Sequence, residues 1–360
     1  MSDSRTTRST SEEPTIERCA DSTAWDRFVE RADGPPFALW AWGDAAEAYG
    51  HDRWYLVARE DGDIVAGLPL VHMTSRLFGS KLVSPPYGER GSVLLRDGDS
   101  DAATDRAVDR LLERTRALAD ALGVEFVSLR GSRVTEMPGF EHKNRFVTFQ
   151  IPLESTEGVW EGIKDSRQRQ VAQAEDAGLT YRTGETLADL EAYYELSLRS
   201  MRGHGTPPHS FGFHRTIWEG LGDDNVHLGM VEYEGELINA ILDFSLGSTV
   251  HQWGVVNDYE YRDLNGGSLA LWKSLERASE AGHDTYEFGR TREGTGVYLF
   301  KKSFGGRKTW YDDYHYFPTG TGDLPHPDDD TYDRAKEVWQ RLPIPVTQYV
   351  GPRIRKEISL

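Results

Sequence analysis

The stretch VHLGMVEYEGELINAILDFSLGSTVHQWGVV, residues 226–256, contains three runs of strand-forming residues separated by short turns. Val226–Tyr233 and Leu237–Leu246 flank a Glu234-Gly235 turn, which predicts a β-hairpin. Val250–Val256 follows directly and predicts a third strand. This part of the chain is therefore expected to form a sheet of sequential strands.

A helix and a further strand are expected after these three strands. Ser268–Ala281 has apolar residues at helical spacing, and Gly282 ends it. Thr285–Phe288 then predicts the returning strand. Strands followed by a helix and a returning strand indicate an α/β fold with mixed sheets and flanking helices.

The first half of the chain repeats this order. Trp54–Ala58 and Ile64–Val71 predict a hairpin, Asp105–Leu122 a helix and Val124–Leu129 a buried strand. The order of elements indicates an internal duplication, although strands and helices also alternate by chance in many proteins. The glycines that match between the halves are Gly62 with Gly235 and Gly123 with Gly282.

The length of 360 residues predicts two domains of ordinary size. A junction helix is expected within Glu157–Gly178, and a short helix near Tyr332–Leu342. The segment that follows, Leu342–Lys356, mixes apolar and basic residues. It could form a helix that packs on the protein, or it could contact a membrane. The predicted segments are a disordered tail at 1–14, domains at 15–150 and 151–320, and a C-terminal extension at 321–360.

The chain is strongly acidic, with a formal net charge of -18, and only 9 of its 41 basic residues are lysines. Such a surface stays hydrated at high salt and repels phosphates, so no DNA partner is expected. The single cysteine, Cys19, excludes an internal disulfide and a multi-cysteine metal site, and no metal is expected. Without a secretory signal or a long apolar run, the expected location is the cytoplasm, with the inner membrane face as an alternative.

Positive charge is concentrated within residues 290–308 of this acidic chain. The segment follows the strand end Tyr286–Arg290 and contains Val297–Gly305, which we predict to be a strand. Because alternate strand residues face opposite sides, either Lys301 or Lys302 should point inward. A Phe-Lys pair beyond a Gly-rich loop suggests a cation in an active site.

Several short motifs occur along the chain in a fixed order. They are Lys164–Arg169, Met201-Arg202 with Gly205-Thr206-Pro207-Pro208, Asn265-Gly266-Gly267, Glu287–Arg290 and Phe300-Lys301. Together these motifs resemble the FemABX group of aminoacyltransferases. The resemblance extends over roughly residues 37–316 and is closest to FemAB-like proteins associated with surface-polysaccharide or exosortase systems.

The resemblance implies two fused GNAT-like domains that transfer an acyl group to an amine. FemABX members with known activity use aminoacyl-tRNA, and ordinary GNAT enzymes use acetyl-CoA, so either donor is expected and no permanently bound cofactor. The implied acceptor is an anionic or lipid-linked precursor of the cell envelope or a surface polysaccharide. The alternatives are an acetyl-CoA-dependent N-acetyltransferase and a non-catalytic assembly or export protein.

Three residues are the catalytic candidates. The resemblance implies that Lys301 helps the transferred carbonyl, where a cation stabilises the negative tetrahedral intermediate. Asp243, which faces His251 across the predicted hairpin, could relay a proton. His204 and the nearby His209 could accept the proton of the amine, although packed or solvated side chains are the simpler alternative.

Arginines are the main candidates for binding an anion. Arg167 and Arg169 resemble the helix that contacts the precursor diphosphate in FemABX enzymes, and their spacing of two lets at most one face the cleft. Arg290 and Arg292 could hold a phosphate through forked hydrogen bonds, or balance nearby acids such as Glu287 and Glu293. Arg202 opens a loop stiffened by two prolines, which suits a binding wall.

The start of the helix near residue 268 bears on the donor. GNAT enzymes that bind CoA have Arg/Gln-x-x-Gly-x-Gly/Ala there, and Asn265 replaces the first glycine beside Gly266 and Gly267. The sequence therefore puts CoA in doubt. In the family the segment containing Tyr87 and Arg90 lines the acceptor cleft, which makes these two residues candidates for that site.

Overall fold

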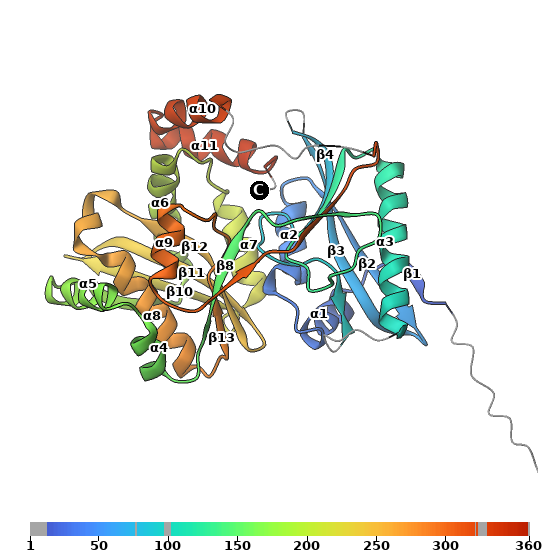
Figure 1. Cartoon of the computed structure of the whole chain (residues 1–360). Coiled ribbons are helices and arrows are strands. Elements are labelled where there is room, and N and C mark those ends of the chain that lie inside the picture. Colours follow the sequence, from blue (N-terminus) through green and yellow to red (C-terminus); the bar gives the residue numbers. More distant parts are fainter. Residues whose placement is uncertain (1–12, 76–77, 97–101, 321, 323–329, 359–360) are drawn as a thin grey trace, which may run out of the picture.

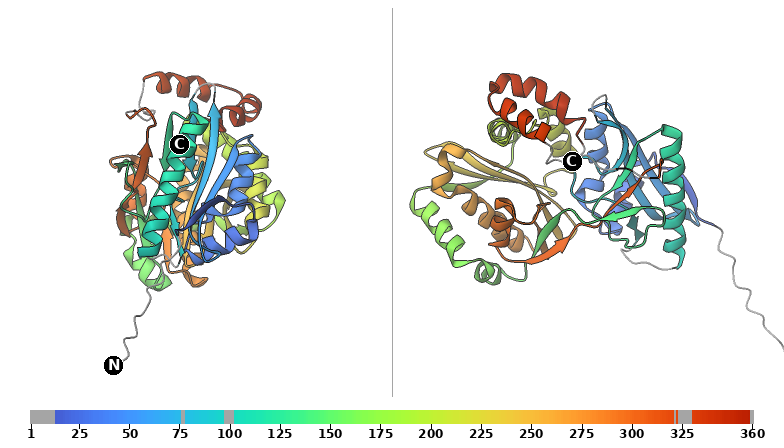
Figure 2. Two further views of the ribbon diagram at one scale, coloured as in Figure 1. Left: turned by 90° about the vertical axis from the view of Figure 1, so that its right-hand side faces the viewer. Right: turned by 45° about the horizontal axis from the view of Figure 1, so that its top comes forward.

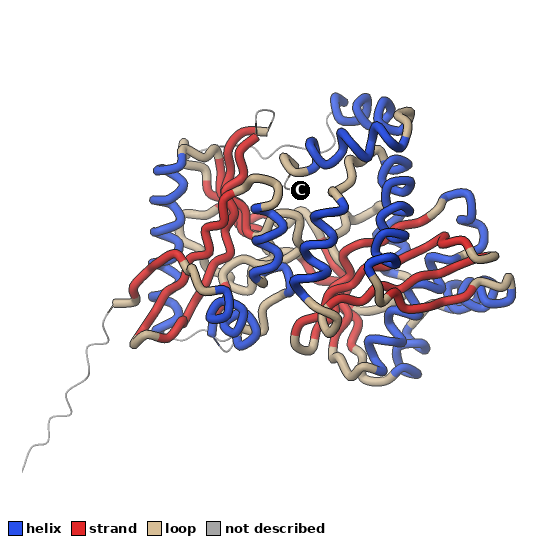
Figure 3. The backbone as a smooth tube through the Cα atoms, turned by 180° about the vertical axis from the view of Figure 1, so that it is seen from behind, coloured by secondary structure: helices blue, strands red, loops and turns tan. Residues whose placement is uncertain are grey.

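The computed structural model describes residues 13–75, 78–96, 102–320, 322 and 330–358, which form two lobes side by side (Figure 1 and Figure 2, right). Residues 1–12 of the predicted tail lie outside the described residues. Each lobe is built on one mixed sheet with helices beside it (Figure 3), which confirms the predicted α/β class.

The first lobe contains helices α1 (Ser22–Arg31), α2 (Trp40–Glu47) and α3 (Ala102–Leu122). Its sheet runs in the order β1 (Thr15–Arg18), β2 (Asp52–Glu60), β3 (Asp63–Ser75), β4 (Gly79–Ser84), β6 (Phe126–Leu129), β15 (Asp313–Tyr316) and β7 (Glu141–Lys143), with β5 (Leu94–Leu95) beside β3.

The second sheet runs in the order β14 (Arg307–Trp310), β8 (Val147–Pro152), β13 (Thr285–Glu287), β12 (Thr249–Asn257), β11 (Glu236–Leu246), β10 (Val226–Tyr233) and β9 (Thr180–Gly184). The helices of this lobe are α4 (Thr156–Gly162), α5 (Asp165–Asp176), α6 (Leu187–His204), α7 (Phe211–Leu221), α8 (Gly266–Glu280) and α9 (Gly296–Lys302).

The two sheets have the same order of strands, as the predicted duplication requires. In each, three antiparallel strands lead through a long helix, α3 or α8, into a parallel strand, β6 or β13. Beside that parallel strand lies an antiparallel one from the other half of the chain, β15 in the first sheet and β8 in the second. The boundary predicted between residues 150 and 151 falls within β8.

Two predicted elements differ in the structure. The junction helix within residues 157–178 is interrupted at Ile163-Lys164, where both residues have extended backbone, and so becomes α4 and α5. The predicted strand Val297–Gly305 is wrong, because residues 296–302 form α9. The side chain of Thr295 accepts a hydrogen bond from the backbone N–H of Tyr298 and so caps this helix.

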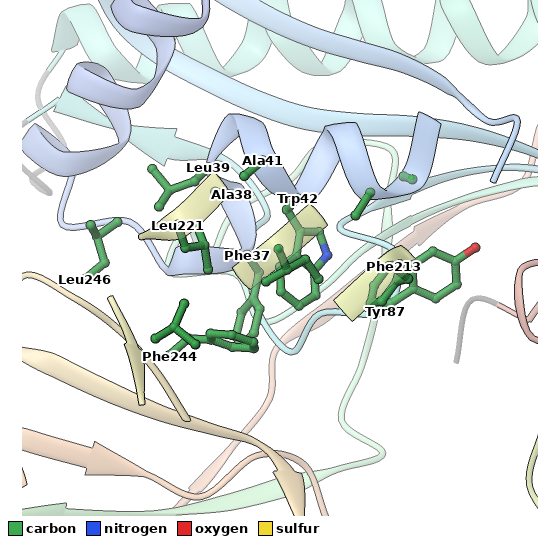
Figure 4. Packing of buried hydrophobic residues seen from close by; sticks show 14 of the residues in the cluster. Phe37, Ala38, Leu39, Ala41, Trp42, Tyr87, Phe213, Leu221, Phe244 and Leu246 are labelled. Carbon is green, nitrogen blue, oxygen red and sulfur yellow. The ribbon is translucent and has the colours of Figure 1, made fainter. Parts of the chain in front are cut away.

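A single apolar cluster joins the lobes. The indole of Trp42 on α2 lies edge-on to Phe213 of α7 and to Phe244 of β11, with ring centroids 6.0 and 5.7 Å apart. Phe37 and Tyr87 of the first lobe belong to the same cluster (Figure 4). Because this core is continuous, the lobes form a fixed interface along which a site can be built.

The C-terminal extension forms two helices, α10 (Asp330–Gln340) and α11 (Ile344–Arg355), at one end of the molecule (Figure 1). Gly351 of α11 packs against Pro208, which confirms the packed helix among the alternatives for the tail. None of the helices in the described parts of the chain is long and apolar enough to cross a membrane.

Candidate active site

The strands β12 and β13 separate and leave a pocket between them. They pair only from Thr249 to His251, opposite Thr285 to Glu287, and β12 continues without β13 beyond that point. We call the cavity of about 500 Å³ there the splay pocket. Its lining includes Gln252 and Val255 of β12, Gly289 after β13, Gly267 of α8, and Phe300 and Lys301 of α9.

A β-bulge lies at the edge of this pocket. Leu242 of β11 faces Gly254 of β12 and Asp243 faces Gln252, so Trp253 is an extra residue without a partner in the ladder of these two strands. The indole N–H of Trp253 donates to the carbonyl oxygen of Tyr87 in the first lobe, 2.8 Å away. Bulges expose backbone groups beside active sites, and this one is fixed from across the interface.

A second cavity, of about 420 Å³, lies between the lobes, and we call it the interdomain pocket. Tyr87 and Arg130 line it from the first lobe, and Pro208, His209 and Arg292 from the second. The two pockets adjoin, because they share the lining residues Glu89, Met201, Trp253, Gly254 and Arg290. A molecule in one pocket can therefore reach a molecule in the other at the bulge.

Lys301 points into the protein, and Lys302 beside it is exposed, as predicted. The Lys301 ammonium group donates to the carbonyl oxygens of Phe288, Gly289 and Arg290 at 3.0, 2.9 and 3.3 Å. An ammonium group has three N–H donors, so all of them are engaged. Burial lowers the pKa of Lys301 to about 8. Lys301 thus holds the loop after β13 in place, and it could bind a substrate carbonyl only by releasing one of these oxygens.

Replacing Lys301 by methionine is expected to lower the free energy of unfolding by about 2 kcal/mol or more, because buried carbonyl groups lose charged donors. The same change at the exposed Lys302 should have little effect. Urea unfolding of the two variants measures the difference. Equal stabilities would show that Lys301 does not hold the loop.

Glu89 lies where the two pockets meet, and it was not among the residues singled out from the sequence. Its carboxylate accepts the backbone N–H of Arg290 at 3.0 Å and is 3.3 Å from the guanidinium Nε of the same residue. The Arg290 guanidinium also lies 3.3 Å from Asp313. Arg290 therefore balances acids, but Glu89 and Asp313 rather than the predicted Glu287 and Glu293. Glu89 adjoins the Tyr87 and Arg90 of the predicted segment, and only the fold reveals its position.

Arg90 does not line either pocket and instead makes a buried ion pair between the lobes. Its Nε lies 2.7 Å from a carboxylate oxygen of Glu287, which also accepts the hydroxyl of Tyr311. Although burial raises the pKa of Glu287, the charge of Arg90 outweighs it, and the pKa falls to about 2. This pair fixes the end of β13, after which Gly289 reaches the splay pocket.

The predicted pairing of Asp243 with His251 is wrong. The bulge shifts the register, so His251 faces Phe244, and adjacent strand residues lie on opposite faces. Asp243 is buried and accepts the hydroxyl of Tyr286 at 2.9 Å, and burial raises its pKa to about 7. It lines neither pocket, although the Tyr286 hydroxyl connects it to Gln252 of the splay pocket.

The two candidate histidines differ in environment. His204 is exposed, lines the splay pocket and lies 2.5 Å from the hydroxyl of Tyr259. His209 is buried beside the interdomain pocket, where its Nε2 accepts from Arg355 at 3.1 Å. Because arginine only donates, that nitrogen carries no proton and its lone pair is already used. Burial lowers the pKa of His209 well below its ordinary value, so His209 is unsuited to accept a proton.

Of the two helix arginines, Arg169 is exposed and Arg167 faces α9, as their spacing predicted. Arg167 donates to Ser303 at 2.7 Å and lies over the ring of Phe300. Arg167 and the half-buried Arg202 line neither pocket. Arg292 does line the interdomain pocket, beside Phe146.

The residues at the start of α8 reach the splay pocket only in part. Gly267 lines it, whereas Asn265 has a left-handed backbone and its amide donates to Gln173 of α5. Gly266 packs so closely on Asn239 that a Cβ atom would lie 2.0 Å from its side-chain oxygen. Helix α5 thus covers one side of this helix start.

Comparisons with known proteins bear on the fold and on the sequence of the second half of the chain. Residues 164–302 match a family model described as an acetyltransferase (GNAT) domain. A comparison with curated proteins found no match in sequence. The crystal structure of FemX is similar with a TM-score of 0.68 and 15% identity, covering 84% of this chain and 97% of that one. L-PGS from Bacillus licheniformis has a TM-score of 0.55 and 12% identity, covering 98% and 100%.

A third similar structure is a tandem GNAT protein from the clavulanic acid biosynthesis pathway, with a TM-score of 0.53 and 14% identity, covering 86% and 100% of the chains. At such identities these likenesses show the fold. The chain therefore has the tandem GNAT-like fold that the resemblance implied, and its second half is similar in sequence to GNAT acyltransferases.

Proposed function

We propose that this protein transfers an acyl or aminoacyl group from an activated donor to an amine on an anionic precursor of the cell envelope or a surface polysaccharide. The observation that carries this proposal is the meeting of two pockets at a β-bulge, with Glu89 at the junction. One pocket can hold the donor and the other the acceptor, so the two reactants meet in a fixed orientation.

In the proposed reaction the donor carbonyl lies in the splay pocket beside the bulge. The backbone N–H at Trp253 or Gly254 is the candidate donor to the carbonyl oxygen as it becomes an oxyanion. This assignment replaces Lys301, whose three N–H groups already bind the loop after β13. Lys301 then acts as a positioning residue for that loop.

The acceptor enters through the interdomain pocket, and Glu89 takes the proton of its amine. The neutral nitrogen attacks the carbonyl carbon, and the bond from that carbon to the donor oxygen or sulfur breaks as the intermediate collapses. The leaving group takes up a proton, and an amide remains. Direct attack of this kind needs no covalent enzyme intermediate, so the protein supplies orientation, a base and oxyanion stabilisation.

The start of α8 bears on the choice between the two donors. A CoA pyrophosphate would need the backbone N–H groups of that helix start, and Gln170 and Gln173 of α5 contact Ser268 and Asn265 there. These contacts favour an aminoacyl-tRNA donor. An acetyl-CoA-dependent N-acetyltransferase is the second candidate, because Gly267 still opens into the splay pocket.

Two measurements with purified protein test the proposal. Radiolabelled aminoacyl-tRNA or acetyl-CoA is mixed with amine-containing envelope precursors, and transfer of label into an amide product is followed. We expect product with one of the two donors. Failure of both donors with every acceptor, while binding of a precursor persists, would favour a non-catalytic assembly protein. Tight binding of acetyl-CoA, measured by calorimetry, would favour the acetyl-CoA-dependent N-acetyltransferase as the function.

A further inference from the structure

The last described residues of the chain cross from the second lobe to the first. Helix α11 packs on the second lobe through Gly351 and Pro208 and ends between the lobes (Figure 1). Beyond it, the carbonyl oxygen of Lys356 accepts the hydroxyl of Tyr87 and lies 2.8 Å from Nε2 of His51. The carbonyl oxygen of Glu357 accepts the ammonium of Lys81 at 3.0 Å. We call residues 351–358 the C-terminal strap.

The strap carries Arg355 to the interdomain pocket. Arg355 lines that pocket, half-buried, and its Nε donates to Nε2 of His209. The other ring nitrogen of His209 lies 3.2 Å from the hydroxyl of Tyr49, which also accepts the backbone N–H of Ser210. These contacts fix the imidazole in its neutral form with the proton on Nδ1, so it orients Arg355 without competing for an anion.

The charge of the interdomain pocket is opposite to that of the protein. Arg130, Arg290, Arg292 and Arg355 line it, and Glu89 is the single carboxylate among its lining residues, in a chain with a net charge of -18. Burial lowers the pKa of Arg130 to about 9, and the charge of the nearby Arg290 lowers it further than burial alone would. Cations that lie close together in a pocket repel one another, and an anion that binds there reduces this repulsion.

We propose that Arg355, on the C-terminal strap, selects an acceptor that bears a phosphate or carboxylate group and binds this group at the wall of the interdomain pocket. This inference deepens the proposed function and rests on the interdomain pocket being the acceptor site. Arg355 is suited to the role because its planar guanidinium can donate two parallel hydrogen bonds to one such group. The reacting amine then extends from this anchor toward the bulge.

Calorimetric binding of inorganic pyrophosphate to the full chain tests the site without any transfer reaction. We expect Arg355→Gln to weaken binding by about tenfold to a hundredfold, as the loss of a charged hydrogen-bond partner requires, and Arg355→Lys to weaken it less. Arg353→Gln is the matched control, since Arg353 is exposed two residues away on the same helix, and it should leave binding unchanged.

Two outcomes would overturn the proposal: no pyrophosphate binding to the unchanged protein, or equal binding by the Arg355→Gln, Arg353→Gln and unchanged proteins. Should Arg355→Gln fail to fold, hydrogen exchange on the unchanged protein decides. Pyrophosphate should slow exchange in residues 351–358 and 206–214, and unaltered exchange there would reject the site.

The transfer assay separates this inference from the proposed function. Glucosamine and glucosamine 6-phosphate carry the same amine with and without an anion, and Arg355→Gln should raise KM for the phosphorylated probe alone. If both probes react and Arg355→Gln changes them equally, the inference fails while the transferase survives. If pyrophosphate binds through Arg355 but no donor yields product, the proposed function fails while the anion site survives.

Discussion

Replacing Glu89 by glutamine is expected to lower kcat by about a hundredfold to ten-thousandfold, which is the usual contribution of a positioned general base. Glutamine keeps the shape and can still accept the backbone N–H of Arg290, so the loop after β13 should remain in place. KM for the donor should change little, because the carboxylate acts on the acceptor amine. Steady-state kinetics with saturating donor measures the effect.

Glu293→Gln is the matched control for Glu89→Gln. Glu293 lies in the loop after β13, is exposed and pairs with Lys308. Replacing it by glutamine should therefore leave kcat unchanged. At higher pH the amine loses its proton to solvent, and the defect of Glu89→Gln should then shrink. An unaltered kcat in Glu89→Gln at neutral pH would remove Glu89 from the mechanism.

Replacing Arg90 by methionine is expected to lower the free energy of unfolding by about 3–5 kcal/mol, because Glu287 would be left as an uncompensated buried charge. Arg59→Met is the control, since Arg59 pairs with Glu17 at the surface and such pairs contribute at most about 1 kcal/mol. Urea unfolding at pH 7 compares the two. Adding Glu287→Leu to Arg90→Met should recover part of the loss.

The same ion pair predicts how stability depends on pH. The pKa of Glu287 is lowered in the folded protein from 4.5 to about 2, so its contribution is complete above pH 4.5 and is lost as the pH falls toward 2. Arg90→Met removes the charge that lowers the pKa of Glu287 most, so burial, which raises this pKa, is less opposed. Glu287 then becomes protonated at a higher pH, which relieves the cost of burying its charge. The difference in the free energy of unfolding between the unchanged protein and Arg90→Met should therefore narrow as the pH falls. A difference that is constant with pH would show that Arg90 acts through packing.

Much of the fold could be predicted because glycines mark where its elements end. Gly62 and Gly235 have positive φ angles in the two hairpin turns, and Gly123 and Gly282 have them after α3 and α8. Strand β10 has its predicted bounds, Val226–Tyr233. Local turn chemistry of this kind is visible in the sequence, so the repeated order of elements was visible too.

The placement of β8 beside β13 and of β15 beside β6 could not be predicted in the same way. Pairing between strands that are far apart in the sequence leaves no local signal. The strand prediction for residues 297–305 failed because Tyr298 and Phe300 are strand-forming residues, whereas the cap at Thr295 and the packing of Phe300 on Phe304 favour a helix. Threonine is a preferred residue at the start of a helix, so Thr295 was the residue of the sequence that could have indicated α9.

The candidate site was only partly predictable. The sequence indicated that Lys301 points inward near the candidate active site, but its three carbonyl partners depend on the turn of α9. The bulge at Trp253 moved His251 away from Asp243, since one extra residue reverses the faces of a strand. Glu89 and Arg355 come from distant segments, and only the packing of the lobes brings them to one pocket.

A crystal structure with a stable adduct of the acyl group and the acceptor amine is the sharpest test of the proposed mechanism. This mechanism requires the carbonyl oxygen to lie within about 3.2 Å of a backbone N–H at Trp253 or Gly254, and the amine nitrogen within about 3.2 Å of Glu89. An adduct bound outside both pockets, or one whose carbonyl contacts Lys301 after that side chain has left the loop, would contradict it.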